Sequence, residues 1–282
     1  MKNSVKIKCP AKINLTLEVV NRREDGFHNI KSIMQMIDLY DYLTITIQDS
    51  EKEEIILSGT SEAIPYNEKN LVYKAAKLYL EEAGIKNLRI EIHIEKNIPI
   101  AAGLAGGSTN AAGTFYGLNY LLKHFDNNKL NDMCASLGSD LNVCLNGGCT
   151  LATSRGEITK KLPCINSFVT LVKPKNLGIS AGEAYTKYSK KELKPQNNMT
   201  EKMIDALNTS KDISGFLYND LEYAVFDDYQ ELQKIKEAYP NAIMSGSGST
   251  YFVLNNINNK LLNDDFEYYE NLKFISDGVS LA

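Results

Sequence analysis

The sequence predicts a globular protein of mixed strands and helices, long enough at 282 residues for two domains. Apolar side chains alternate with polar ones over residues 5–19 and 88–95, which is the pattern of strands with one wet face. They recur at helical spacing over residues 70–84 and 111–122, which predicts helices with one apolar face. With 43% hydrophobic and 23% charged residues, the chain can bury a sizeable core.

The bulk composition narrows the functional classes. A formal net charge of −4 argues against a nucleic-acid-binding surface, because such a surface needs clustered cations. The five cysteines are an odd number without a Cys-x-x-Cys pair, so we expect reduced, structural thiols. The first residues lack a signal-peptide pattern and no apolar run reaches membrane-spanning length. We therefore expect a cytoplasmic protein without membrane partners, either a monomer or a homodimer.

The first strand pattern places Lys12 and Asn14 on one face, because the apolar residues occupy the odd positions from 5 to 19. Pro10 cannot donate a ladder hydrogen bond, so it indicates an edge or a bulge, where a strand can re-aim side chains toward a site. The alternative interpretation of Lys12, taken alone, is a lysine on a solvated face.

A charged turn at residues 22–26 predicts a hairpin or loop that leads into Phe27 and His28. An aromatic side chain beside a histidine on a loop can recognise a flat ring. The alternative is that Phe27 plugs the core and His28 is an ordinary surface residue. An apolar run follows at residues 33–37, and residues 40–47 predict a further strand.

A glycine-rich stretch organises the centre of the chain, and its sequence is Gly103-Leu104-Ala105-Gly106-Gly107-Ser108-Thr109-Asn110-Ala111-Ala112. It joins the strand at 88–95 to the helix at 111–122, so the free N–H groups of that helix point back at the loop and favour an anion. We expect Ser108 or Thr109 to cap the helix. The spacing fits neither a P-loop nor a dinucleotide-binding motif, and a purely structural glycine turn is the alternative.

The next candidate is Asp140, which follows a predicted helix over residues 130–137 that ends at Gly138. Such a junction can hold a short side chain over a cleft. The alternative is an aspartate that caps a short following helix. A strand that ends near residues 154–156 closes the first domain, so we expect domains at 1–158 and 159–282.

In the second domain we expect a strand at 168–172 and helices at 200–207 and 221–239. The charged run at 187–194 predicts a solvated loop or short helix, and residues 255–259 are an asparagine-rich connection without an assignable function. Residues 242–254 predict a strand, a glycine-serine loop and a second strand. That loop is a second candidate for close backbone approach.

Six motifs in one order resemble the GHMP kinases, and the resemblance spans nearly the whole chain. They are Pro10-Ala11-Lys12-Ile13-Asn14-Leu15, Gly26-Phe27-His28, residues 103–112, Gly138-Ser139-Asp140, Asn219-Asp220-Leu221-Glu222 and residues 245–250. The resemblance implies an α+β chain in two domains, with the active site in the cleft between an ATP-binding domain and a substrate-side domain. It implies ATP-dependent phosphorylation of the 2-hydroxyl of a cytidine-diphosphate-linked methylerythritol, with Mg²⁺, in the non-mevalonate route to isoprenoids.

The same resemblance assigns roles to residues. Lys12 and Asp140 would flank the acceptor hydroxyl, Asp140 as the base and Lys12 as the charge-stabilising group. Residues implied in ATP binding are Asn70, Leu71, Lys96, Gly103, Leu104, Ala105, Gly106, Gly107, Ser108 and Thr109. Residues implied in substrate binding are Asn14, Phe27, His28, Tyr185, Gly246, Ser247 and Gly248. The ATP phosphates would carry most of the Mg²⁺ coordination, with Ser108 as a candidate ligand.

The sequence departs from the family pattern at Phe27, where tyrosine is frequent, and at Ala105, Thr109 and Asn142. None of these changes removes a proposed catalytic group. Two rival functions stay open: a GHMP kinase for another small molecule such as mevalonate, homoserine or galactose, and an inactive nucleotide-binding protein on the same scaffold. The joint presence of Lys12, Asp140 and Ser108 speaks against the second.

Overall fold

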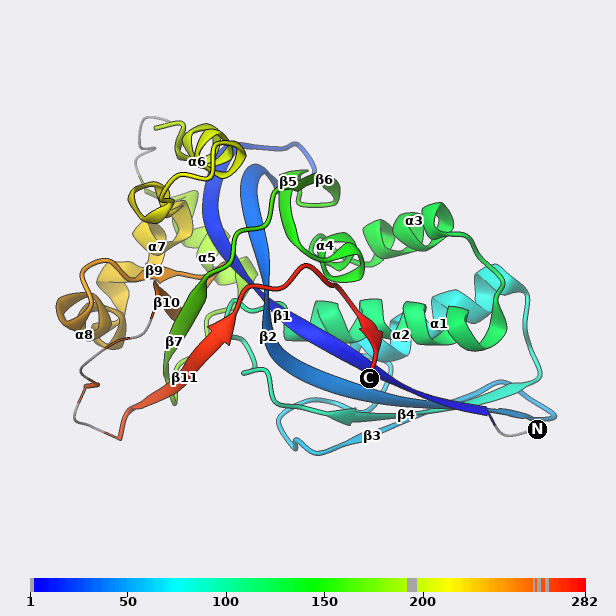
Figure 1. Ribbon diagram of the computed structural model, residues 1–282. Coiled ribbons are helices and arrows are strands. Elements are labelled where there is room, and N and C mark those ends of the chain that lie inside the picture. The colour runs from blue at the N-terminus through cyan, green and yellow to red at the C-terminus, as the bar shows by residue number, and fades with distance from the viewer. Residues whose placement is uncertain (1–2, 192–196, 256, 258–259, 262–263) are drawn as a thin grey trace.

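The computed structural model describes residues 3–191, 197–255, 257, 260–261 and 264–282. Two sheets with helices packed against them make up this part of the chain, which is the predicted α+β architecture (Figure 1). No helix in these ranges combines the length and the apolarity of a membrane span. Part of the asparagine-rich stretch at 255–259 lies outside the described residues.

The larger sheet has the strand order β12-β1-β2-β4-β3, with β5 paired to β2, β6 to β5 and β8 to β1. Its strands are β1 (Asn3–Arg22), β2 (His28–Asp49), β3 (Glu54–Gly59), β4 (Leu88–Glu95), β5 (Cys149–Ser154), β6 (Ile158–Leu162), β8 (Tyr218–Asn219) and β12 (Ser280–Leu281). The smaller sheet has the order β11-β7-β10-β9. Its strands are β7 (Phe168–Pro174), β9 (Ile243–Met244), β10 (Tyr251–Leu254) and β11 (Phe266–Lys273).

The α-helices divide between the two sheets, as Figure 1 shows. They are α1 (Leu71–Ala83), α2 (Gly106–Leu122), α3 (Asn127–Leu137), α4 (Leu141–Asn146), α5 (Ala181–Tyr188), α6 (Met199–Asn208), α7 (Asp220–Val225) and α8 (Gln230–Ala238). Two short 3₁₀ helices lie at Ser214–Phe216 and Phe226–Asp228. The helices expected at 70–84, 130–137 and 200–207 are therefore confirmed. Asn70 caps α1 by accepting from the Val72 N–H at 3.0 Å.

β1 and β2 form one long hairpin that runs through the whole molecule (Figure 1). Its register shifts between Pro10 and Ala11, so the predicted bulge is present. Residues 9–19 of β1 are buried along their whole length, because structure covers both faces of the strand there. The polar face with Lys12 and Asn14 consequently lies inside the protein, and a solvated Lys12 is excluded.

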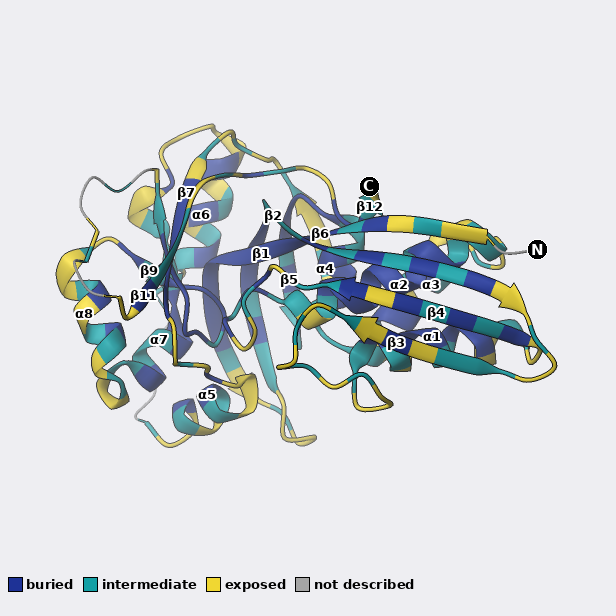
Figure 2. Ribbon diagram, turned by 90° about the horizontal axis from the view of Figure 1, so that it is seen from below, coloured by how far each residue is buried: buried dark blue, intermediate teal, exposed yellow. Residues whose placement is uncertain are grey.

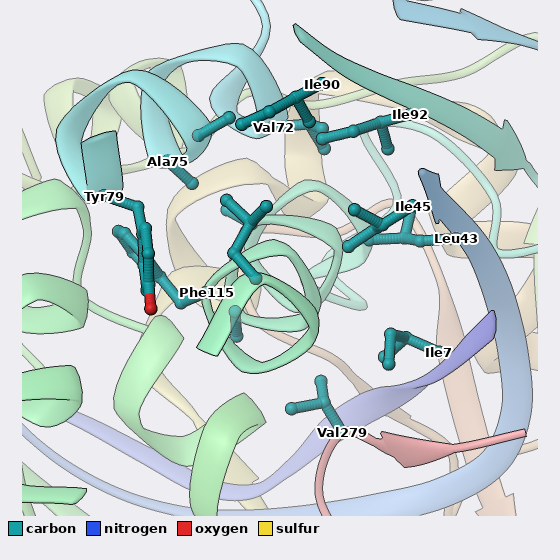
Figure 3. Packing of buried hydrophobic residues seen from close by; sticks show 14 of the residues in the cluster. Ile7, Leu43, Ile45, Val72, Ala75, Tyr79, Ile90, Ile92, Phe115 and Val279 are labelled. Carbon is teal, nitrogen blue, oxygen red and sulfur yellow. The ribbon is translucent and has the colours of Figure 1, made fainter. Parts of the chain in front are cut away.

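The core beneath the larger sheet lies between its strands and α1, α2 and α3. Figure 3 shows Ile7, Leu43 and Ile45 of the strands directed toward Phe115 of α2 and Tyr79 of α1. The opposite face of this part of the sheet is open to solvent, so buried and more exposed residues alternate along β4 (Figure 2). A separate core packs α5, α7 and α8 around the smaller sheet, with Val172, Tyr251 and Leu232 among its members.

Two element predictions are wrong. The helix expected at 221–239 is broken into α7 and α8, because Tyr229 is extended with φ −132° and ψ 110°. The helix after the glycine loop begins at Gly106, so Ser108 and Thr109 lie inside its first turns and cap nothing. Its N-cap is Ala105, held in the left-handed region at φ 58° without a side-chain cap.

The charged run at 187–194 begins as the end of α5, and its residues 192–194 lie outside the described residues. The boundary at residue 158 stays a prediction. β6 pairs with β5 in the larger sheet, and β8 and β12 bring later parts of the chain back to β1.

Candidate active site

A cavity of about 1040 Å³ lies where β1, the glycine loop, the start of α4, α5 and the 245–249 loop meet. The structure brings most of the predicted site residues to its wall: Lys12, Asn14, Phe27, His28, Asn70, Leu71, Lys96, Gly103, Leu104, Ala105, Gly106, Gly107, Ser108, Asp140, Tyr185, Gly246 and Ser247. Thr109 and Gly248 are not among the lining residues. Thr109 is fully buried and its N–H bonds to the Ala105 carbonyl within the helix.

Lys12 is held rigidly at the base of this cavity. Its side chain is 4% exposed, and its ammonium donates to Asn14 Oδ1 at 2.7 Å and to the Gly103 carbonyl at 3.0 Å. Asn14 is itself fixed, because its Nδ2 donates to Ser32 Oγ at 2.7 Å. An ammonium has three N–H groups, so one is left for a group in the cavity.

Asp140 faces that ammonium, with its Oδ2 3.6 Å from Lys12 Nζ. It precedes α4 but makes no side-chain capping bond, so the helix-cap interpretation does not account for it. Its side chain is 28% exposed, whereas Lys12 is almost completely covered. A carboxylate that is open to the cavity beside a buried cation can accept a proton from a bound hydroxyl.

The glycine loop presents the start of α2 to the same cavity. The first N–H groups of a helix have no partner inside it, and their dipoles favour a negative charge. A Cβ on Gly106 would lie 2.7 Å from Lys96 Nζ, so glycine here lets the lysine reach the loop. The loop and the helix end can therefore hold an anion such as a phosphate.

Sequence reasoning missed Asp41, the partner of Lys96. This carboxylate is fully buried and pairs with Lys96 Nζ, while its Oδ1 accepts from the N–H groups of Asn97 at 2.7 Å and Ile98 at 2.8 Å. It therefore fixes Lys96 and the backbone that leads toward the loop. An acidic residue between Tyr40 and Tyr42 in a strand pattern gave no sign of this role.

The 245–249 loop packs directly on the glycine loop. A Cβ on Gly103 would lie 1.9 Å from the Ser245 carbonyl oxygen, so only glycine allows this approach. Ser245 Oγ donates to the Gly103 carbonyl at 3.0 Å. Asn219, noticed in the sequence only as part of a motif, orients the loop by donating to the carbonyls of Met244 at 2.6 Å and Gly246 at 2.8 Å.

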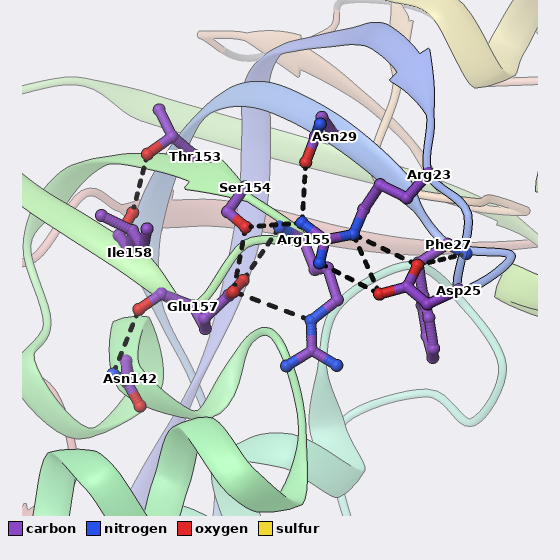
Figure 4. Close-up of polar contacts among 10 residues, drawn as sticks. All are labelled: Arg23, Asp25, Phe27, Asn29, Asn142, Thr153, Ser154, Arg155, Glu157 and Ile158. Atoms are coloured by element: carbon purple, nitrogen blue, oxygen red, sulfur yellow. Dashed lines mark hydrogen bonds and ion pairs between the residues drawn. The ribbon is translucent and has the colours of Figure 1, made fainter.

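At the far end of the cavity the β1–β2 turn carries Phe27, which is 53% exposed and so is not a core plug. The Arg155 guanidinium lies over its ring, 5.3 Å from the centroid. Figure 4 shows the network that joins this turn to the end of β5: Arg23 bonds to Asp25, to Asn29 at 3.1 Å and to Ser154 at 3.3 Å. Sequence reasoning did not find Arg155.

His28 stacks on Tyr185 of α5, and its Nε2 lies 3.0 Å from Ser189 Oγ. Burial lowers the pKa of His28, and the charge of Arg22 lowers it further. Burial raises the pKa of Tyr185, with Asp140 as a second cause. In both rings burial disfavours the charged form.

The cavity is rich in cations although the chain is acidic overall. Its wall includes Lys12, Arg22, Lys69, Lys96, Arg155 and Lys190, and Asp140 is its one carboxylate among the described residues. A concave surface of one sign raises the local concentration of a ligand of the opposite sign. In the part of the chain that the structure describes, no group of three or more His, Cys, Asp or Glu side chains is placed to hold a metal ion.

A helix start that can hold an anion, a cationic wall and a lysine–aspartate pair thus lie in one cavity. Residues 70–150 match the family described as GHMP kinases N terminal domain. A 4-diphosphocytidyl-2-C-methyl-D-erythritol kinase from Bacillus pumilus (strain SAFR-032) is 40% identical over 256 residues, 88% of this chain and 86% of that protein. The chain belongs to the GHMP kinase family and, within it, to the 4-diphosphocytidyl-2-C-methyl-D-erythritol kinases.

Two solved structures are similar to this chain. A crystal structure of 4-(cytidine 5'-diphospho)-2C-methyl-D-erythritol kinase is 31% identical, with a TM-score of 0.70 and 90% of both chains covered. A homoserine kinase from Cytophaga hutchinsonii has a TM-score of 0.78 over 100% of this chain and 98% of that chain. At 19% identity it shows the fold alone.

Proposed function

We propose that this protein transfers the γ-phosphoryl group of ATP to the 2-hydroxyl of 4-diphosphocytidyl-2-C-methyl-D-erythritol, in the non-mevalonate route to isoprenoid precursors. The observation that carries the proposal is the Lys12–Asp140 pair, 3.6 Å apart beside the glycine loop in one cavity. The identity of the acceptor is supported by two relatives, 40% and 31% identical to this chain, that are named as kinases of this compound. The cytoplasmic location and the oligomeric state stay predictions.

In the proposed reaction the acceptor oxygen attacks the γ-phosphorus, the bond to ADP breaks, and Asp140 takes the hydroxyl proton. Lys12 contributes its remaining N–H to the charge that spreads over the phosphoryl oxygens. Because Asn14 and Gly103 hold the ammonium already, little reorganisation is needed at the moment of transfer. The chain therefore contributes mainly position and charge.

The ATP phosphates would enter the glycine loop, with Asn70, Leu71 and Lys96 on the adenosine side. The residues present fit Mg²⁺ that arrives with the nucleotide, because Ser108 lines the cavity and a dedicated carboxylate cage is absent from the described residues. Bound in this way, Mg²⁺ would neutralise charge on the β and γ phosphates.

The cytidine end would lie at Phe27, His28 and Tyr185, with the cationic wall around its diphosphate. This end separates the proposal from the rival kinases, since mevalonate, homoserine and galactose have no base to place there. A coupled assay of ADP release with these four acceptors is the test. We expect turnover with the cytidine substrate alone, and comparable turnover of mevalonate would overturn the assignment.

A second experiment tests recognition of the cytosine ring. Wild type should prefer the cytidine substrate to its uridine analogue, and His28→Ala should reduce that preference, because unpaired edge contacts carry the discrimination. An unchanged preference in His28→Ala would remove His28 from base recognition.

A further inference from the structure

The last residues of the chain touch both elements that carry the catalytic pair. Residues 275–282, here called the tail segment, lie far from the glycine loop in sequence. β12 within it pairs with β1, with Ile7 opposite Leu281 and Lys8 opposite Ser280. The Ala282 N–H donates to the Lys6 carbonyl at 3.0 Å. The tail segment is therefore bonded to the strand that carries Lys12.

The same segment is bonded to the helix that follows Asp140. The Val279 N–H donates to the Cys144 carbonyl at the end of α4, at 3.0 Å. A Cβ on Gly278 would lie 2.5 Å from the Leu145 carbonyl oxygen and 2.6 Å from that of Cys144. On the facing side, a Cβ on Gly147 would lie 2.0 Å from the Gly278 nitrogen. The two backbones are in direct contact, and the pair of glycines makes that contact sterically allowed.

Outside the tail segment, two side-chain hydrogen bonds tie helix α4 to its neighbours: Asn142 Nδ2 donates to the Glu157 carbonyl at 3.2 Å and Asn146 Nδ2 to Asn131 Oδ1 at 2.6 Å. The helix has six residues, and its N-cap makes no side-chain bond. Buried apolar residues such as Leu141 and Cys144 hold it against the core, but apolar packing is non-directional. Val279 joins the same core beside Ile7 of β1, as Figure 3 shows. A backbone hydrogen bond and a close backbone contact are the directional restraints that the tail segment adds.

Upstream, the tail segment is tied to the sheet as well. The Ile275 N–H donates to the Met36 carbonyl at 3.0 Å, and Gln35 Nε2 donates to the Ile275 carbonyl at 3.0 Å. Its position is thus set by β2 before it reaches α4, and by β1 after it. The tail segment therefore links α4 to both strands of the β1–β2 hairpin through backbone hydrogen bonds.

We propose that the tail segment positions Asp140 against Lys12, with Gly278 and Val279 as positioning residues for the phosphoryl transfer. The inference rests on the proposed roles of Lys12 and Asp140. A small displacement of α4 would move the carboxylate away from the acceptor hydroxyl while the walls that bind ATP and the cytidine end stay in place. The loss should therefore fall on kcat and leave KM nearly unchanged.

The test is steady-state kinetics on Gly278→Ala, whose added methyl group must push α4 and the tail segment apart, and on the milder Val279→Ala. Each is assayed well below its own Tm. We expect kcat to fall about tenfold or more in Gly278→Ala, since misplacement of about 1 Å can cost a hundredfold, with both KM values within about threefold. Val169→Ala on β7 is the matched control, because it removes the same two methyl groups from a fully buried site. Its kcat should stay within about twofold of wild type.

The decisive arm repeats these variants in the Asp140→Asn background. If the tail segment acts through Asp140, Gly278→Ala and Val279→Ala should lower kcat no further there. An equal fold loss in both backgrounds would mean general damage and would overturn the inference, as would unchanged kcat in both tail variants. A normal rate in Asp140→Asn alone would instead refute the proposed base.

Discussion

The ring of His28 lies flat against the ring of Tyr185, with centroids 5.1 Å apart and planes 17° apart. The family resemblance implies that Phe27, His28 and Tyr185 bind the substrate, and a flat cytosine ring would stack on an aromatic face there. In the structure His28 already covers one face of Tyr185. A base that used that face would displace the imidazole, whereas Phe27 is 53% exposed and has the Arg155 guanidinium over its ring. Phe27 is consequently the more accessible stacking surface.

Phe27→Ala should raise KM for the cytidine substrate roughly ten- to a hundredfold, because stacking of a base on an aromatic ring contributes about 1–3 kcal/mol. KM for ATP should hardly change. Steady-state kinetics checks this, with Tyr120→Ala as a control, since Tyr120 is a similarly exposed aromatic on α2 that does not line the cavity. Equal effects of the two substitutions on the cytidine substrate would argue against a stacking role for Phe27.

His28 should titrate below its ordinary pKa of 6.5, because burial and then Arg22 disfavour its charged form. The unfolded chain then binds more protons than the folded one at and below pH 6.5, so stability falls as pH drops through that range. NMR titration of the three histidines, with His28→Gln to assign the signal, measures the shift. Arg22→Ala should recover only part of it, since burial is the larger cause. A His28 pKa at or above 6.5 would contradict the predicted effect of burial and of Arg22 on this side chain.

Asp140→Asn and Lys12→Ala should each lower kcat on the order of a hundredfold or more, the usual scale for a general base or an electrostatic group. Both act on the same hydroxyl, so the double variant should be little worse than the worse single one. ATP affinity, measured by calorimetry, should be largely retained. Simple multiplication of the two losses would indicate that the residues act separately.

Asp41→Ala should destabilise the protein by about 3–5 kcal/mol, because it leaves the buried Lys96 ammonium and two backbone N–H groups without their partner. Urea unfolding measures the change. Glu95→Ala is the matched control: it breaks the Lys6–Glu95 pair, whose side chains are 46% and 37% exposed. Exposed pairs contribute at most about 1 kcal/mol. Similar losses in both variants would show that burial of the pair is not what matters.

How far the sequence predicts this molecule depends on the range of the contacts involved. The hairpin, the glycine loop and the extent of α1 are local, so spacing and turn chemistry predict them. Periodicity showed that Lys12 shares a face with Asn14, but not that the second face of β1 is also covered. Only contacts with distant segments bury it, and the family resemblance supplied the role that spacing alone left open.

The features that the sequence did not predict also depend on contacts between distant segments. β12 has two residues, too few for any period, and it exists because it pairs with β1 more than 270 residues away. In the sequence Asp41 looks like any acidic residue in a strand, because its partners, Lys96 and the backbone N–H groups that follow it, come from a distant segment. The break between α7 and α8 lies in a segment with continuous helical periodicity, and the extended Tyr229 that causes it leaves no compositional sign.

The Gly103 carbonyl accepts from both Lys12 Nζ and Ser245 Oγ. A carbonyl oxygen has two lone pairs, so these two donors saturate it. A compound that pushed the glycine loop outward would have to break a bond to the lysine and a bond to the opposite loop at once. For inhibitor design this wall should be treated as fixed, and the adaptable side of the cavity is the one formed by the exposed Phe27 and the surface of α5.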